Sequence, residues 1–268
     1  MPRTLIVGVL NVTPDSFSDG EPFGSAEQTI ARGLGLVDDG ADWIDVGGES
    51  TRPGAVAVSE QDERARVVPV VEGLTARVRG RARLSIDTYK AGTAAAALRA
   101  GATVVNDISG GLRDPDILRV AAQAGAAIVL GHMRGMPATM MDDVHFADVV
   151  REVGDELGAR LEAARAAGCR EIWADPGIGF GKKLEHNLAL LRALPRLRVR
   201  LGVPLMLGVS RKRFIGELTG RQVSERIHGT AAAVTAAVLG GVAAVRVHDV
   251  AAMRDVVLVA EALAADCA

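Results

Sequence analysis

Polar side chains with chemical potential stand at the ends of several short apolar runs in this sequence. Asn11, Asp87, Asn106 and Asp175 each lie at or directly after the end of such a run. Parallel strands bring their carboxyl ends to one mouth of a barrel or one edge of a sheet, so these side chains are expected to meet. Two carboxylates and two amides can pair with the donors and acceptors of a flat, nitrogen-rich heterocycle. One such acid alone is equally well explained as a helix cap or turn residue, whereas the set favours a ring-binding site.

A second group of polar residues is cationic. The stretch Val203–Phe214 is an apolar run that leads into Arg211, Lys212 and Arg213. Three cations on one loop are more often a solvated turn than a site. Because the other apolar runs also end in polar residues, we favour a binding site over a solvated turn here. Lys212 is then placed to reach a carbonyl of the bound ring.

Arg246 and His248 form a third group. They are two residues apart in an apolar run, so on a strand their side chains share a face. An arginine and a histidine with Asn11 across the mouth suit a polyanion such as diphosphate, and barrels commonly bind phosphate near their seventh and eighth strands. The alternative is a structural role for Arg246, paired with Asp249 or Asp255.

Sequence motifs for metals and nucleotide cofactors are missing. The sequence has no HExxH, no Cys–His metal set, no GxSxG elbow and no Walker loop. A metal would be a hard ion held by the phosphates of the substrate with help from Asn11, and Mg²⁺ fits that role. The glycines of 177–181 lack the rest of a dinucleotide fingerprint, so a nicotinamide cofactor is not expected.

The bulk composition is that of an ordinary globular protein. The 268 residues are 49% hydrophobic and carry a formal charge of −2, which argues against nucleic acid as a partner. Cys169 and Cys267 lie far apart and suggest two free thiols in a reducing compartment. The first apolar run is too short for a signal peptide, and the longest, Ala231–Val245, is shorter than the roughly 20 residues of a membrane span. We therefore expect a cytoplasmic protein.

Eight apolar runs alternate with helical segments along the chain. The expected strands are Thr4–Val9, Trp43–Val46, Leu84–Ile86, Val104–Val105, Ala127–Leu130, Ile172–Ala174, a run within 203–209, and Val242–Val247. No linker or low-complexity insert divides them. The pattern predicts an α/β protein that is a single (β/α)8 TIM barrel over residues 1–268, with a doubly wound open sheet as the alternative.

Seven motifs resemble those of the dihydropteroate synthase family: GVLNVTPDSFSDG, DVGGESTRPGA, SIDT, NDISGG, DPGIGFGK, GVSRKRFIG and VRVHD. The resemblance extends from Ile6 to Asp249. It implies a pterin-binding (β/α)8 barrel, usually a homodimer, that joins 6-hydroxymethyl-7,8-dihydropterin diphosphate to p-aminobenzoate in folate biosynthesis and is inhibited by sulfonamides. The Ala-rich helix expected from about Ser224 to Leu239 is a candidate dimer surface, because small residues allow close helix approach.

The resemblance also implies roles for individual residues. It assigns the pterin pocket to Asp87, Asn106, Ile108, Met133, Asp175, Phe180, Gly208 and Lys212. It assigns the diphosphate to Asn11, Arg246 and His248, with Mg²⁺ on Asn11. It assigns p-aminobenzoate to Phe17, Thr51, Arg52, Pro53, Phe180 and Arg213. Many members carry Ser in place of Arg213, so either its guanidinium or a backbone amide of the turn would meet the carboxylate of that substrate.

The expected mechanism is a dissociative substitution, with Lys212, Arg246, His248 and Asp19 as catalytic residues. Diphosphate leaves while Mg²⁺, Arg246 and His248 hold its charge, and the pterin carries the cation at its exocyclic methylene. The resemblance implies that two loops close over the site, one with Phe17 and Asp19 and one with Thr51, Arg52 and Pro53. Asp19 and these loops exclude water, which would otherwise compete for this cation.

Two other functions remain open from the sequence. A methyltetrahydrofolate:corrinoid methyltransferase of the same barrel group has no need for the STRPGA and SRKRF motifs. A non-catalytic pterin-binding paralogue has no use for Asp19, Arg52 or the anion cluster. An assay for diphosphate release that depends on p-aminobenzoate separates all three functions.

Overall fold

The computed structural model describes residues 3–12, 26–51 and 54–265. Within these residues eight parallel strands form one sheet, in the order β6-β5-β4-β3-β2-β1-β8-β7. The strands are β1 (Leu5–Asn11), β2 (Trp43–Gly47), β3 (Arg83–Asp87), β4 (Val104–Asp107), β5 (Ala127–Gly131), β6 (Ile172–Asp175), β7 (Met206–Gly208) and β8 (Ala244–Val247).

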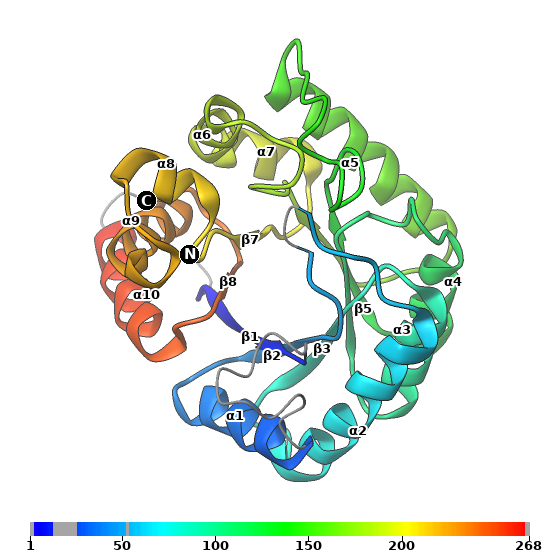
Figure 1. Ribbon diagram of the computed structural model, residues 1–268. Helices are drawn as coiled ribbons and strands as arrows, with labels where there is room; N and C mark the ends of the chain where they lie inside the picture. The colour runs from blue at the N-terminus through cyan, green and yellow to red at the C-terminus, as the bar shows by residue number, and fades with distance from the viewer. Residues whose placement is uncertain (1–2, 13–25, 52–53, 266–268) are drawn as a thin grey trace.

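Helices surround the strands on the outside, as Figure 1 shows. They are α1 (Ala26–Asp38), α2 (Glu60–Val78), α3 (Ala91–Arg99), α4 (Asp116–Ala124), α5 (Val149–Ala166), α6 (Leu184–Arg192), α7 (Leu194–Leu201), α8 (Arg213–Thr219), α9 (Ile227–Leu239) and α10 (Val250–Ala265). None of the helices in the described part of the chain is long and apolar enough to cross a membrane.

The sheet closes on itself between β6 and β7. An isolated bridge joins Ala174 to Leu205, and the N–H of Ala174 donates to the carbonyl oxygen of Pro204 at 3.1 Å. Proline has no N–H to return, so the ladder is short here and β7 extends over only three residues. The eight strands thus form a nearly closed barrel, which confirms the predicted (β/α)8 fold and excludes the open sheet.

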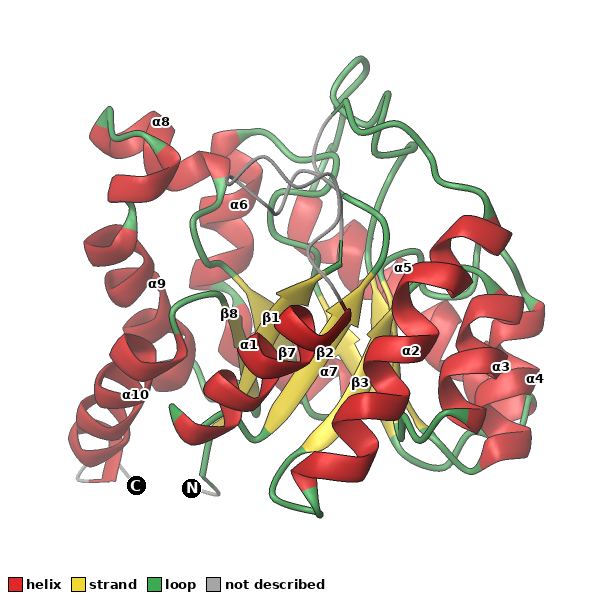
Figure 2. Cartoon of the chain, turned by 60° about the horizontal axis from the view of Figure 1, so that its bottom comes forward, coloured by secondary structure: helices red, strands yellow, loops and turns green. Residues whose placement is uncertain are grey.

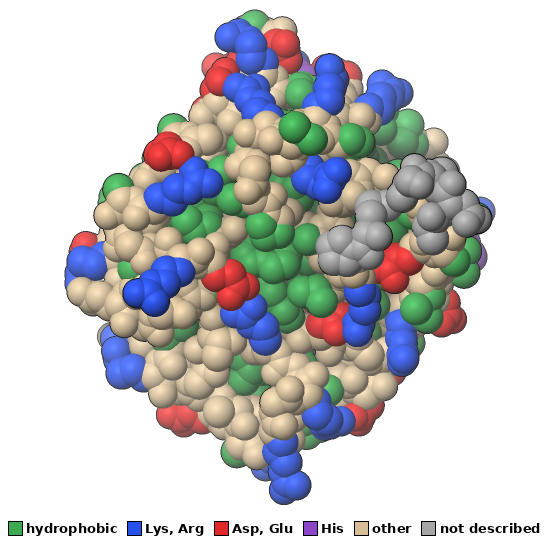
Figure 3. All heavy atoms as spheres, turned by 180° about the vertical axis from the view of Figure 1, so that it is seen from behind, with side chains coloured by type: hydrophobic (Ala, Val, Ile, Leu, Met, Phe, Trp, Pro, Cys, Tyr) green, Lys and Arg blue, Asp and Glu red, His purple; other side chains and the backbone are tan. Residues whose placement is uncertain are grey.

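Apolar side chains fill the amino end of the barrel. Trp43 of β2 and Trp173 of β6 meet edge to face, with ring centroids 5.0 Å apart. In the view from behind (Figure 3), hydrophobic side chains occupy the centre of the face and charged ones surround them. Residues two positions further along a strand point to the same side, one layer higher. In that layer Asp45 follows Trp43 and Asp175 follows Trp173, so the interior changes from apolar to polar toward the carboxyl end.

The chain between β6 and β8 differs from the predicted pattern. Two additional helices are present, α7 before β7 and α8 directly after the cationic turn. The Ala-rich helix predicted from about Ser224 begins at Ile227, after a 3₁₀ turn at Val223–Glu225. Helix α8 ends at Thr219 and is capped by Gly220, whose φ of 72° is in the left-handed region. These short helices carry the segments that border the mouth of the barrel.

Candidate active site

A cavity of about 670 Å³ opens at the carboxyl ends of the strands, where the connecting loops gather in Figure 2. Twelve of the predicted site residues line it: Asn11, Thr51, Asp87, Asn106, Ile108, Asp175, Phe180, Gly208, Lys212, Arg213, Arg246 and His248. They lie on, or in the segment after, each strand except β5. One cavity therefore brings together side chains from most of the predicted motifs.

The remaining predicted residues have other positions. Met133 does not line this cavity, but packs with Ile108 and lines a smaller neighbouring cavity. The other four, Phe17, Asp19, Arg52 and Pro53, lie outside the described residues.

Two carboxylates hold Arg246 at the floor of the cavity. Its Nε donates to Oδ2 of Asp45 at 2.6 Å, and its Nη2 donates to Oδ2 of Asp87 at 2.7 Å. The amide Nδ2 of Asn106 donates to the same oxygen of Asp45 at 2.9 Å. Asp45 is absent from the predicted set, and the signal that points to it is its place two residues after Trp43 on the inward face of β2. The predicted structural partners of Arg246, Asp249 and Asp255, do not make these contacts.

Asp87 keeps one carboxylate oxygen unpaired. Its Oδ2 accepts from Arg246, whereas the buried Oδ1 has no hydrogen-bond partner among the described residues. Burial raises the pKa of Asp87 to about 7, the positive charge of Arg246 opposes this, and the carboxylate of Asp45 adds to it. A buried acceptor without a donor indicates a place for a donor on a ligand.

Lys212 and Asp175 form the opposite wall. The ammonium of Lys212 donates to the carbonyl of Ile178 and lies 4.3 Å from the centroid of the Phe180 ring. Burial lowers the pKa of Lys212 to about 8, while Asp175 acts in the other direction. Asp175 accepts from the N–H of Gly177 at 2.7 Å, and burial raises the pKa of its carboxyl. This wall offers an acceptor, a cation and an aromatic face to the same small volume.

The mouth of the cavity is built around the turn after β7. The N–H of His248 donates to Oγ of Ser210 at 3.2 Å, and Nδ1 of the same histidine lies 3.0 Å from that oxygen. Nε of Arg211 donates to Asp249 at 2.9 Å. The φ of Arg211 is 58°, in the left-handed region, and its N–H donates to Oγ1 of Thr230 at 3.0 Å. These contacts hold a strained turn at the point where the predicted cations line the mouth.

Arg213 begins α8 and its side chain is exposed. Its Nε donates to Oε1 of Glu217, one helical turn later, at 2.7 Å. Both residues line the cavity. The guanidinium therefore lies at the outer edge of the mouth.

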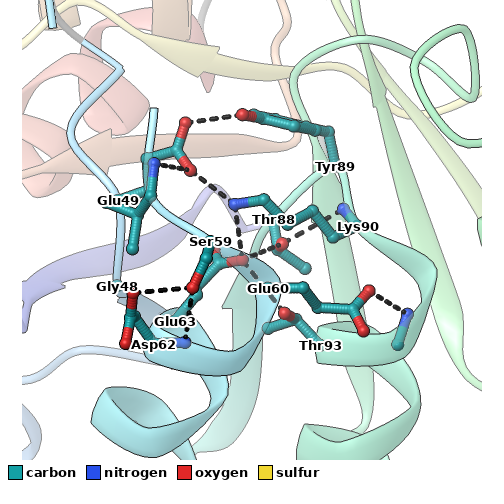
Figure 4. Close-up of polar contacts among 12 residues, drawn as sticks. Gly48, Glu49, Ser59, Glu60, Asp62, Glu63, Thr88, Tyr89, Lys90 and Thr93 are labelled. Carbon is teal, nitrogen blue, oxygen red and sulfur yellow. Dashed lines mark hydrogen bonds and ion pairs between the residues drawn. The ribbon is translucent and has the colours of Figure 1, made fainter. Parts of the chain in front are cut away.

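An ion-pair cluster joins the end of β2 to α2 and to the start of α3 (Figure 4). Nζ of Lys90 lies 2.5 Å from Oε2 of Glu49 and 2.9 Å from Oε2 of Glu63. The hydroxyl of Tyr89 donates to Oε1 of Glu49 at 2.6 Å, and the N–H of Val58 donates to Oε2 at 3.2 Å. Glu49, which also lines the cavity, thus ties the end of β2 and Val58 to the start of α3. Neither Glu49 nor Lys90 is in the predicted set.

The comparisons with known proteins agree with this geometry. A family model described as "Pterin binding enzyme" matches residues 7–248. A dihydropteroate synthase from Synechocystis sp. is 46% identical over 264 residues, which cover 97% of this chain and 90% of that protein. The chain belongs to the dihydropteroate synthase family.

Solved structures of dihydropteroate synthases share the fold. The enzyme from Xanthomonas albilineans with 4-aminobenzoic acid has a TM-score of 0.90 at 46% identity, over 98% of this chain and 93% of that chain. The enzyme from Yersinia pestis in a sulfonamide drug complex has a TM-score of 0.92 at 39% identity, over 98% and 95% of the two chains. The resemblance to the dihydropteroate synthase family seen in seven motifs is confirmed over the whole fold.

Proposed function

We propose that the chain condenses 6-hydroxymethyl-7,8-dihydropterin diphosphate with p-aminobenzoate, giving 7,8-dihydropteroate and diphosphate in folate biosynthesis. The observation that carries this proposal is a single cavity with buried carboxylates on its inner walls and cations at its mouth. The inner walls suit a ring with several N–H donors, and Arg246 at the floor, together with Asn11 and His248, suits an anionic leaving group. Membership in the dihydropteroate synthase family supports the same reaction.

The ring-binding part uses Asp87, Asn106, Asp175 and Lys212. The unpaired Oδ1 of Asp87 and the carboxylate of Asp175 accept N–H groups of the pterin, and Lys212 donates to its carbonyl. The predicted apolar contacts are Ile108, Met133, Phe180 and Gly208, and of these Phe180 offers its ring face beside Lys212. Unpaired polar atoms reject a ring that lacks matching donors, so the pocket selects for the pterin edge.

The buried carboxylates also favour the dissociative mechanism. Asp45, Asp87 and Asp175 place negative charge in a low-dielectric interior, and burial raises the pKa of the last two. A cation that develops on the pterin methylene relieves this unfavourable charge, so it is stabilised more than the neutral ground state. The chain then needs no covalent nucleophile.

The anion side is assigned to Asn11, Arg246 and His248, which all line the cavity. The described residues hold no cluster of three His, Cys, Asp or Glu side chains able to bind a metal ion. The site fits an Mg²⁺ ion that is bound mainly by the diphosphate of the substrate and would take one further oxygen from the amide of Asn11. When bound, this ion would neutralise charge on the leaving diphosphate. Arg246 and His248 then orient the diphosphate toward the mouth.

The p-aminobenzoate site is assigned to Thr51, Phe180 and Arg213, together with Phe17, Arg52 and Pro53. Thr51, Phe180 and Arg213 line the cavity. Asp19 would help the two loops to exclude water from the reacting centre. A sulfonamide would occupy the same place, and the Yersinia pestis dihydropteroate synthase has been solved in a sulfonamide drug complex.

The state of the protein in the cell belongs to the same proposal. Residues 1–268 form one pterin-binding domain that acts in the cytoplasm as a homodimer, with α9 as the candidate surface. Sedimentation velocity over a range of protein concentrations tests the dimer, and a single monomeric species throughout would contradict it.

One assay tests the proposed reaction. Purified protein is mixed with the pterin diphosphate and Mg²⁺, and diphosphate release is followed with and without p-aminobenzoate. We expect release that depends on p-aminobenzoate and an equal amount of 7,8-dihydropteroate by mass spectrometry. Methyl transfer from methyltetrahydrofolate would point to the methyltransferase, and pterin binding without turnover would point to a non-catalytic paralogue.

A further inference from the structure

We propose that Lys182 is a positioning residue for the p-aminobenzoate side of the pocket, because its buried ammonium fixes the turn that carries Phe180. This inference rests on the proposed function. It concerns a residue outside the predicted site, although the side chain is buried and lines the same cavity.

The surroundings of Lys182 contain hydrogen-bond acceptors. Its Nζ lies 2.9 Å from Nδ1 of His132, 2.9 Å from the carbonyl oxygen of Gly177 and 3.0 Å from the carbonyl oxygen of Phe180. The carbonyl of His132 is a fourth, longer contact at 3.3 Å. Three short acceptors match the three N–H groups of an ammonium, whereas a neutral amine has only two. The geometry therefore specifies the charged lysine, although burial lowers its pKa to about 7 against the opposing effect of Asp175.

A chain of hydrogen bonds continues from Lys182 through His132 to Glu156 and Arg134. Lys182 only donates, so Nδ1 of His132 is the acceptor and Nε2 carries the proton. Nε2 lies 3.1 Å from Oε2 of Glu156, to which it donates. Burial lowers the pKa of His132 to about 4, which keeps the imidazole neutral in this role. Glu156 in turn accepts from Nε of Arg134 at 3.1 Å.

The turn held by Lys182, residues 177–181, packs closely against the backbone of His132 and Arg134. Gly177 and Gly181 have φ values of 68° and 59°, and a Cβ at Gly177 would collide with the carbonyl oxygen of His132. A Cβ at Gly181 would lie 2.6 Å from the carbonyl oxygen of Arg134. Such close approach is possible only for glycine, so the turn carries no side chain on this side, whereas Ile178 on its other side packs into the core. Lys182 supplies the contacts that packing would otherwise provide.

Two groups at the reacting site depend on this turn. The ring of Phe180 lies beside the Lys212 ammonium, and the carbonyl of Ile178 accepts from the same ammonium. Asn187 makes a separate contact, since its Oδ1 accepts from the N–H of Gly179 at 2.7 Å. Loss of Lys182 would therefore remove the hydrogen bond to the carbonyl of Phe180 and loosen this residue, while the turn stays attached through Gly179 and the buried Ile178. The pterin acceptors on β3 and β4 would keep their positions.

The neighbouring lysine provides a matched control. Lys183 is exposed, and its side chain makes no cap hydrogen bond to α6. We expect Lys182→Met to raise the KM for p-aminobenzoate about tenfold or more, with a smaller change in the affinity for 6-hydroxymethylpterin measured by calorimetry. Lys183→Met should change both by less than about twofold. A folded Lys182→Met protein with an unchanged KM, or equal effects of the two substitutions, would overturn the proposal.

Rescue distinguishes a specific ammonium from general packing. Lys182→Cys is unfolded, alkylated with 2-bromoethylamine and refolded, which restores a side chain of lysine length with a terminal ammonium. The wild-type protein treated in the same way corrects for alkylation of Cys169 and Cys267. We expect the KM to return to within about threefold of this reference, whereas alkylation of Lys182→Cys with bromopropane should leave it raised. Equal KM values after the two alkylations would contradict a role for the charge.

If the substitutions at Lys182 do not fold, a variant at His132 tests the proposed role of Lys182. His132→Leu removes one of the three short acceptors and leaves the lysine in place, so a smaller rise in the same KM is expected; no rise would overturn the proposal. If the wild-type protein itself forms no dihydropteroate, the proposed function fails. The role of Lys182 is then tested by calorimetry, which compares the affinities of Lys182→Met and Lys183→Met for 4-aminobenzoate.

Discussion

Arg246 and Asp45 form an ion pair inside the barrel, with Nε 2.6 Å from Oδ2 and the carboxylate fully buried. Asp87 receives the second arm of the same guanidinium, and Asn106 donates to the same oxygen of Asp45. A buried charge that loses its partner is strongly unfavourable. The floor of the site is therefore a network in which each member holds another in place.

We predict that Asp45→Asn lowers the free energy of unfolding by about 3 kcal/mol, because Arg246 loses one of its two carboxylates. Turnover should fall by about 100-fold, because the guanidinium and the Asn106 amide lose their fixed positions. Urea unfolding and steady-state kinetics measure the two effects. Asp39→Asn, at an exposed position, is the control. Wild-type turnover in folded Asp45→Asn protein would contradict the assigned role of the pair.

The affinity for pterin is predicted to rise as the pH rises through about 7. Burial raises the pKa of Asp87 to about 7, and below this value the protonated carboxyl no longer accepts N–H groups at both oxygens. Asp87→Asn should weaken binding and flatten most of this rise, and the remainder would come from Asp175, whose pKa burial also raises. Toward pH 8 the loss of a proton from Lys212, whose pKa burial lowers to about 8, should act in the opposite direction. Calorimetric titration of 6-hydroxymethylpterin between about pH 5.5 and about pH 8 measures the effect. A wild-type affinity that does not change with pH would count against this role of Asp87.

Lys90→Met is predicted to destabilise the protein by about 3 to 5 kcal/mol at neutral pH. The substitution leaves Glu49 and Glu63 buried without a cation between them. The loss should shrink as the pH falls, since burial raises the pKa of Glu63 and its protonation removes the uncompensated charge. Lys183→Met serves as the control in the same unfolding experiment. A loss below about 1 kcal/mol would mean that the cluster does not stabilise the junction between β2, α2 and α3.

A sulfonamide is predicted to compete with p-aminobenzoate. Both would lie beside Phe180 near the mouth, so the drug should raise the apparent KM for p-aminobenzoate and leave kcat unchanged. Initial rates at several concentrations of both compounds measure this. Inhibition that p-aminobenzoate does not relieve would place the drug elsewhere.

The strands and much of the site were predictable from the sequence because each apolar run ends where a polar residue begins. This pattern found Asn11, Asp87, Asn106 and Asp175, which all line the cavity. Asp45 was not found, because it stands inside the run Trp43–Val46 and only the alternation of faces separates it from its neighbours. The inward direction of that face depends on closure of the barrel, which no local pattern encodes.

The sequence also does not show that Lys182 and Lys183 have different environments. They are adjacent and identical in type, yet the first is buried among acceptors and the second is exposed. The difference arises from the glycine turn that precedes them and from the backbone of His132, which lies 50 residues earlier in the chain. Contacts at such separation depend on the tertiary fold, so charge and spacing alone do not distinguish the two lysines.

A crystal structure with 7,8-dihydropteroate tests the central claim most directly, namely that one cavity at the carboxyl end of the barrel carries the reaction. We predict that the pterin ring contacts Asp87, Asn106, Asp175 and Lys212, with the aminobenzoate ring beside Phe180 and directed toward the mouth. Product bound at another surface, or with its pterin ring away from Asp87 and Asp175, would contradict it.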